Sequence, residues 1–133
     1  MTVTPNLKLI IVDDEQDVGL ISELNFQTAI RDGSIDFHFF ENAQKCLTYL
    51  DESPEKGQYL VITDINMPEI SGFDLLEKIK KTHPNVEVFM MSAYDNMDYI
   101  KKSMTLGATG YFTKPVSYHN IKLRITQKYG IPL

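Results

Sequence analysis

The residues of this sequence that could do chemistry stand directly after short apolar runs. Each run is typical of a buried strand, and each polar residue lies where the strand gives way to a loop. The five residues are Asp13, Asp14, Asp64, Ser92 and Lys114. Carboxylates, a hydroxyl and an ammonium group in one place could bind a hard cation together with a negatively charged ligand.

Three of these five groups are carboxylates, which repel one another at short range. Two unit charges 4 Å apart cost about 4 kcal/mol at an effective dielectric constant near 20. A cation must offset this repulsion, and Lys114 is one candidate. A divalent ion is the other, because oxygen ligands with room for water suit Mg²⁺. We therefore predict a Mg²⁺ site, in which Mn²⁺ is a possible substitute.

Strands and helices alternate along the chain, which predicts the frame that positions these residues. We predict strands over 7–12, 35–40, 59–63, 86–91 and 109–113, and helices over 16–31, 43–50, 71–82, 96–106 and 117–128. Such alternation implies a three-layer, doubly wound (βα)5 domain, with a parallel sheet covered on both faces. Residues 35–40 alternate apolar with polar and suit an edge strand, and 54–57 form a turn. Ligands of such sheets bind beyond the carboxyl ends of the strands, where the five polar residues converge.

The composition excludes several classes of function. The chain has 13 Lys and Arg against 18 Asp and Glu, a net charge of −5, which argues against direct nucleic-acid binding. Its longest aliphatic run has four residues, 9–12, far short of the ~20 that cross a membrane. Without a secretory signal and with Cys46 as its one cysteine, the protein is expected in the cytoplasm. We expect a single domain over 1–133 with a core of about 7–128 and no output domain.

As a set, the strand-end motifs resemble the receiver domain of bacterial response regulators in two-component signalling, including the chemotaxis response regulator. The resemblance covers about residues 7–128, and its motifs are Val12-Asp13-Asp14-Glu15, Thr63-Asp64-Ile65-Asn66-Met67-Pro68 with Gly72, Met91-Ser92-Ala93, and Gly110-Tyr111-Phe112-Thr113-Lys114-Pro115. It implies a flavodoxin-like fold with strand order 2-1-3-4-5.

The resemblance also implies a role for each residue of the site. Asp64 would accept a phosphoryl group from a phosphohistidine of a sensor histidine kinase, from a phosphotransfer protein or from a small phosphodonor. Ser92 and Lys114 would bind the phosphoryl oxygens. The Mg²⁺ ligands would be the side chains of Asp13, Asp14 and Asp64 and the backbone carbonyl of Asn66. The domain would catalyse its own phosphorylation and dephosphorylation and act on no external substrate.

Further residues take roles by the same resemblance. Ser92 and Tyr111 would form a switch that alters the surface of helix 96–106, strand 109–113 and helix 117–128. That surface would contact an effector protein or an output domain outside this chain, or form a phosphorylation-dependent homodimer. Asn66 and Tyr94 would tune the dephosphorylation rate, and the Lys114–Pro115 bond would be cis.

Other interpretations of these residues stay open. Taken singly, Asp13 or Asp14 could cap a helix, and Asp64 could begin a turn. An aspartate-dependent hydrolase would also use a phospho-aspartyl group, although such phosphatases favour a second acid where this chain has Asn66. A pseudo-receiver would keep the fold without taking phosphate. Away from the site, we expect Met97 and Met104 to pack their helix onto the sheet.

Overall fold

A computed structural model describes residues 7–53 and 57–133 and contains a parallel sheet of five strands in the order β2-β1-β3-β4-β5. The strands are β1 (Leu7–Val12), β2 (Ile35–Phe40), β3 (Tyr59–Asp64), β4 (Glu87–Ser92) and β5 (Gly110–Thr113). The helices are α1 (Gln16–Asn25), α2 (Gln27–Arg31), α3 (Ala43–Glu52), α4 (Gly72–Thr82), α5 (Met97–Thr105) and α6 (Tyr118–Tyr129). The predicted three-layer, flavodoxin-like architecture and its strand order are confirmed.

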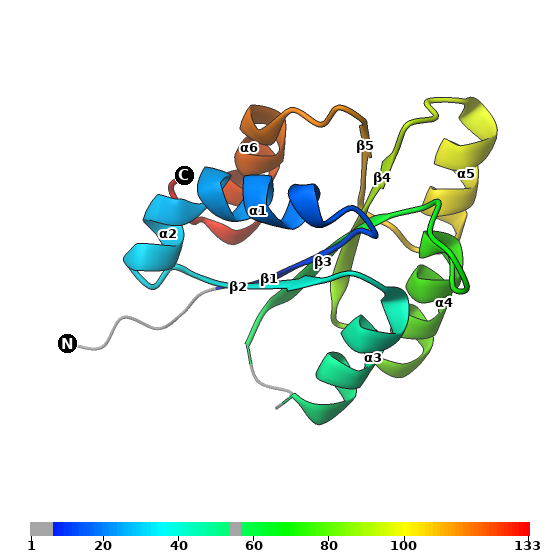
Figure 1. Cartoon of the computed structure of the whole chain (residues 1–133), viewed down its shortest axis with the longest axis horizontal. Helices are drawn as coiled ribbons and strands as arrows, with labels where there is room; N and C mark the ends of the chain where they lie inside the picture. The colour runs from blue at the N-terminus through cyan, green and yellow to red at the C-terminus, as the bar shows by residue number, and fades with distance from the viewer. Residues whose placement is uncertain (1–6, 54–56) are drawn as a thin grey trace.

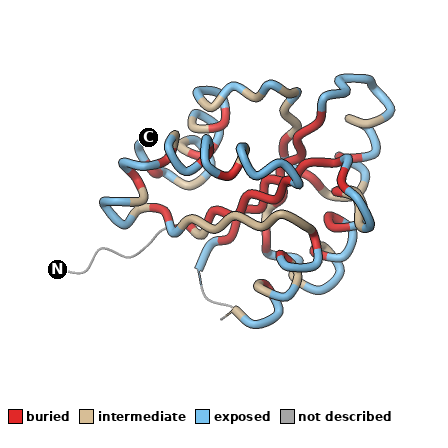
Figure 2. The backbone as a smooth tube through the Cα atoms, in the orientation of Figure 1, coloured by how far each residue is buried: buried red, intermediate tan, exposed pale blue. Residues whose placement is uncertain are grey.

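The helices form two layers, one on each face of the sheet. Figure 1 shows α1, α2 and α6 on one face and α3, α4 and α5 on the other. The buried residues follow the central strands in Figure 2, and all six residues of β3 are buried. Strand β2 lies at the edge, as its alternating pattern predicts, and four of its six residues are only partly buried. The predicted turn at 54–57 falls mostly outside the described residues.

The strand register aligns the chemically important residues at one edge of the sheet. Val12 at the end of β1 is paired with Thr63 of β3, so Asp13 and Asp64 follow at neighbouring positions. Ser92 at the end of β4 is paired with Thr113 of β5, directly before Lys114. Parallel pairing therefore brings residues far apart in sequence to the same carboxyl edge.

The single helix predicted over 16–31 is wrong, because the chain breaks into α1 and α2 at Phe26. Phe26 leaves helical geometry with ψ of 12° and is buried, with its ring edge-on to Tyr118. Ile21 and Leu24 have the spacing of an apolar helix face, but both are exposed. Small residues face the core instead, because α1 lies close to the ring of Phe39, and its buried members are Gly19 and Ser22.

The expectation that Met97 and Met104 pack α5 onto the sheet is wrong. Their exposed fractions are 62% and 43%. The one fully buried residue of α5 is Ser103, whose hydroxyl donates to the carbonyl of Tyr99 over 2.8 Å. Ser103 therefore faces the core, whereas both methionines lie on the exposed part of the helix surface.

The fit of α1 against the edge strand is testable at Gly19. A Cβ at this position would lie 2.6 Å from the Phe39 ring. Alanine normally favours a helix over glycine by about 1 kcal/mol. We expect Gly19→Ala to lower the free energy of unfolding by about 1–3 kcal/mol instead, because the core is overpacked.

Urea unfolding measures this effect. Leu20→Ala, at an exposed position of the same helix, is the control and should change stability by less than about 0.5 kcal/mol. The cost of Gly19→Ala should shrink in a Phe39→Leu background. A stabilised Gly19→Ala protein would contradict the packing.

Candidate functional site

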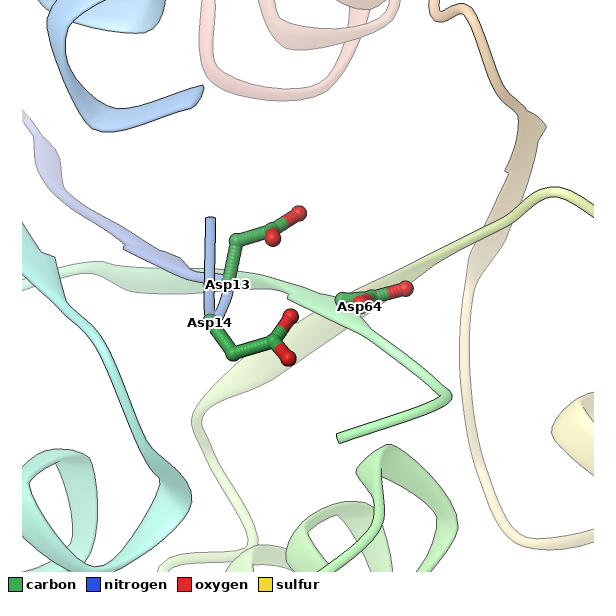
Figure 3. Close-up of side chains that lie close together, drawn as sticks. All are labelled: Asp13, Asp14 and Asp64. Atoms are coloured by element: carbon green, nitrogen blue, oxygen red, sulfur yellow. The ribbon is translucent and has the colours of Figure 1, made fainter. Parts of the chain in front are cut away.

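Three carboxylates meet at the carboxyl edge of the sheet, where β1 and β3 end. Figure 3 shows the side chains of Asp13, Asp14 and Asp64 gathered there, and one oxygen of each lies within 4.8 Å of the others. Asp13 is fully buried and Asp64 is 7% exposed, whereas Asp14 is exposed. The structure thus brings together the three acidic residues that the sequence singles out.

Lys114 reaches this cluster from the end of β5. Its Nζ donates to Asp13 Oδ2 over 2.7 Å and lies 3.4 Å from Asp64 Oδ1. Glu15 Oε1 lies 3.6 Å away on the exposed side. One ammonium group therefore faces two buried carboxylates and offsets part of their repulsion.

Backbone contacts hold the two buried aspartates in place. Asp13 donates its N–H to the carbonyl of Phe40 over 3.1 Å and accepts the Glu15 N–H at Oδ1 over 2.9 Å. The loop after Asp64 folds tightly against the start of α4. Gly72, the first residue of that helix, donates its N–H to the carbonyl of Ile65 over 2.7 Å. A Cβ at Gly72 would overlap the Asp64 carbonyl oxygen, so only glycine fits here.

Burial, together with the neighbouring charges, shifts the pKa values of the site residues. Burial and the nearby charge of Asp13 raise the pKa of Asp64 to about 6, against the pull of Lys114. Burial likewise raises the pKa of Asp13, despite hydrogen bonds from Lys114 and Glu15. Burial opposes the charge of Lys114, but its hydrogen bond to Asp13 and both carboxylate charges hold its pKa above the usual value.

Ser92 and Tyr111 lie on the β4 and β5 side of this edge. Ser92 is buried, and its Oγ accepts the N–H of Tyr94 over 3.0 Å. The hydroxyl of Tyr111 donates to the carbonyl of Tyr94. The Lys114 N–H donates to the Ser92 carbonyl over 2.7 Å, and the Lys114–Pro115 bond is cis. The 92–94 turn is therefore hydrogen-bonded both to Tyr111 of β5 and to Lys114, which directly follows β5.

The family described as response regulator receiver domain matches residues 9–126 of this chain. The chain belongs to that family. Receiver domains of this family are the phosphorylatable part of two-component response regulators. They are generally not enzymes on external substrates.

Curated relatives of this receiver domain differ widely in length. Sporulation initiation phosphotransferase F of Bacillus subtilis is 29% identical over 88% of this chain and 89% of its own. Response regulator protein PilR of Pseudomonas aeruginosa is 30% identical over 86% of this chain. The Arabidopsis thaliana two-component response regulator ARR12 is 34% identical over 87%. The chain spans only 24% of the PilR protein and 18% of ARR12.

Solved structures share the fold of this receiver domain. The receiver domain of Francisella response regulator 1452 has a TM-score of 0.80 at 22% identity, over 94% of this chain and 98% of that one. The receiver domain of Saccharomyces cerevisiae Ssk1, in complex with histidine phosphotransfer protein Ypd1, has a TM-score of 0.79 at 22% identity, over 97% and 92%. Among the described residues, no helix is long and apolar enough to cross a membrane.

Two neighbours of the site escape the sequence-based reasoning. Glu15 has no predicted role beyond its place in a motif, yet it is a third acidic neighbour of Lys114. Tyr99 belongs to none of the predicted motifs, yet its hydroxyl donates to Asn66 Oδ1 over 3.4 Å. For Glu15, the acidic run after the first strand is the only signal in the sequence. For Tyr99 no local signal exists, because Tyr99 and Asn66 are 33 positions apart.

The raised pKa of Asp64 makes stability depend on pH. The unfolded chain releases this proton near pH 4, but the folded protein keeps it up to about pH 6. Ionisation therefore destabilises the folded state as the pH rises through this window, and the full cost is present above pH 6. With a chelator present to keep the protein free of metal, we expect Asp64→Asn to raise the free energy of unfolding by about 1–2 kcal/mol at pH 8. Near pH 4 the same substitution should change it little.

Urea unfolding at several pH values checks this prediction. Asp98→Asn removes an exposed carboxylate in the first turn of α5 and controls for loss of a charge in general. Its effect should stay within about 0.5 kcal/mol. An equal gain for Asp64→Asn at pH 8 and pH 4 would show that ionisation of the buried carboxyl is not the cause.

Proposed function

We propose that this receiver domain takes a phosphoryl group on Asp64 from the phosphohistidine of a sensor histidine kinase or phosphotransfer protein, or from a small phosphodonor. The observation that carries the proposal is the position of Asp64, a nearly buried carboxylate beside the Lys114 ammonium and two further aspartates. The phosphotransferase name of the Bacillus relative and the phosphotransfer partner bound by Ssk1 support this donor class.

The chemistry follows from the charges that the site provides. An Asp64 carboxylate oxygen attacks phosphorus, and the new O–P bond forms as the P–N bond to histidine breaks. The imidazole leaves with the bonding electron pair. Phosphoryl transfer spreads negative charge over the equatorial oxygens, so a positioned cation such as Lys114 stabilises the transition state. Hydrolysis of the acyl phosphate by water releases inorganic phosphate and restores the carboxylate.

The acidic residues fit a Mg²⁺ ion. Three carboxylate oxygens within 4.8 Å are hard ligands for a divalent ion, and exposed Asp14 leaves room for water ligands. Asp13, Asp14 and Asp64, with the backbone carbonyl of Asn66, would hold it. When bound, Mg²⁺ supplies positive charge that offsets the repulsion between the phosphoryl group and these carboxylates.

Ser92 and Tyr111 are the proposed switch. Ser92 Oγ now accepts the Tyr94 N–H, so its movement toward a phosphoryl oxygen would release the 92–94 turn. The Tyr111 hydroxyl, bound to the Tyr94 carbonyl of that turn, would lose its acceptor and allow the ring to turn inward. The altered surface of α5, β5 and α6 would then contact an effector or output domain, or a second copy of the chain.

Two rival functions predict different behaviour. A hydrolase turns over an external phosphate ester many times, and Asn66 stands where such an enzyme favours an acid. A pseudo-receiver takes no phosphate, yet this chain has the complete set of acids, hydroxyl and lysine. A phosphoaccepting receiver takes up one phosphoryl group per chain.

Incubation with Mg²⁺ and acetyl phosphate separates the three functions. We expect a mass gain of one phosphoryl group, which Asp64→Ala abolishes. We also expect Lys114→Ala to slow phosphorylation at least about tenfold, because a charge-assisted contact to the phosphoryl oxygens contributes about 1.5–3 kcal/mol. No mass gain, either here or with candidate kinases, would refute the proposal, and multiple turnover of a phosphate ester would favour the hydrolase.

The pH dependence of metal binding tests the proposed Mg²⁺ site separately. Because the pKa of Asp64 is about 6 in the metal-free protein, Mg²⁺ must displace a proton below that pH. We expect the apparent affinity to be about tenfold weaker at pH 5 than at pH 8, as measured by calorimetry. Asp14→Asn should weaken binding at both pH values. An affinity that is constant between pH 5 and pH 8 would contradict the release of a proton from Asp64 when the metal binds.

A further inference from the structure

Tyr99 of α5 connects three segments that surround Asp64. Its hydroxyl donates to Asn66 Oδ1 in the β3–α4 loop over 3.4 Å. Its ring lies edge-on to Phe73 of α4, with ring centroids 5.3 Å apart, and tilted against Tyr94 at 5.5 Å. Tyr94 in turn belongs to the turn that begins at Ser92. Tyr99 therefore touches the loops that follow both β3 and β4.

The backbone of Tyr99 is anchored independently of these contacts. Its N–H is capped by the Asn96 side chain over 2.9 Å, and its carbonyl accepts the hydroxyl of fully buried Ser103 over 2.8 Å. These two hydrogen bonds fix the main chain of Tyr99 within α5, and the ring contacts with Phe73 and Tyr94 support its side chain. Asn66, by contrast, is exposed and lies in a loop two residues after Asp64. Of the two partners, Tyr99 is the one that can orient the other.

The contact selects one orientation of the Asn66 amide. With Oδ1 engaged by the Tyr99 hydroxyl, the remaining end of the amide is its NH₂ group, which offers only donors. Water that hydrolyses an acyl phosphate becomes more acidic as its O–P bond forms. An acceptor nearby would help this water by taking a hydrogen bond from it, and an NH₂ group cannot do so.

We propose that Tyr99 is a positioning residue that prolongs the life of the acyl phosphate on Asp64 by holding the Asn66 amide with its NH₂ end free. This inference rests on the proposed function of Asp64. Loss of the Tyr99 hydroxyl lets the amide rotate and present Oδ1 to the attacking water. Phosphorylation itself involves no attacking water, so its rate does not depend on this orientation.

Tyr99→Phe removes the hydroxyl and keeps the ring contacts with Phe73 and Tyr94. The protein is phosphorylated with acetyl phosphate and Mg²⁺, the donor is removed, and loss of the phosphorylated form is followed by mass spectrometry with Mg²⁺ present. We expect the half-life to fall about two- to fivefold, in line with one exposed hydrogen bond. The rate constant for phosphorylation should stay within about 1.5-fold of the unmodified protein, whereas a general distortion of the site would slow this step too.

The matched control is Tyr118→Phe. Tyr118 also makes a side-chain hydrogen bond, to Ser22 over 2.8 Å, but it lies on α6 at the opposite face of the sheet. We expect this variant to keep the original half-life. In an Asn66→Ala background, Tyr99→Phe should have no further effect on the half-life, because the two residues act through one contact.

A second variant tests the inference without altering Tyr99. Asn66→Asp places an acceptor oxygen toward the water whichever way the group turns, so its half-life should also be shorter and should be insensitive to Tyr99→Phe. If the unmodified protein takes up no phosphate, the proposed function fails, and the inference fails with it. If it is phosphorylated and Tyr99→Phe decays at the original rate, or acts equally in the Asn66→Ala background, only the inference about Tyr99 is overturned.

Discussion

Two buried carboxylates facing one lysine are the constraint on which the rest of this structure depends. Asp13 and Asp64 are withdrawn from water at the edge of the sheet, which by itself disfavours their charged forms. Lys114 bridges them, with its Nζ 2.7 Å from Asp13 and 3.4 Å from Asp64. Because one positive charge faces two negative ones, with Asp14 beside them, the site retains an excess of negative charge. That excess of negative charge is what the proposed Mg²⁺ ion would offset.

The sheet meets this constraint because the three residues stand at the ends of hydrogen-bonded strands and not within long loops. Asp64 is the last residue of β3, and Asp13 and Lys114 come directly after β1 and β5, so the strand register sets the positions of all three. The loop that follows Asp64 must pass close to that residue's own carbonyl, and it can do so because position 72 has no side chain. In a less regular frame the carboxylates could move apart into water, and the negative charge would no longer be concentrated at one place.

Much of this arrangement follows from the sequence because it depends on strands and on residues next to them. Strand ends are marked by a change from apolar to polar residues, and parallel pairing then places Asp13, Asp64 and Lys114 at the same edge. The helices are less predictable. Val18, Ile21 and Leu24 have helical spacing, yet the core receives Gly19 and Ser22, because the depth available under α1 is set by the Phe39 ring. Periodicity reports where apolar residues lie along a helix, but it contains no information on how closely the neighbouring element approaches.

Periodicity also does not reveal that α5 is packed less deeply than α4. Helix α4 buries Leu75, Leu76 and Ile79, whereas α5 has Ser103 as its one fully buried residue. Displacing α5 therefore exposes less apolar surface than displacing α4, and it costs less free energy. The turn that starts at Ser92 leads directly into α5, and Tyr99 links that helix back to the loop after Asp64. If a phosphoryl group on Asp64 draws Ser92 toward it, α5 can respond at a lower cost than α4. The exposed Met97 and Met104 then belong to the surface that changes.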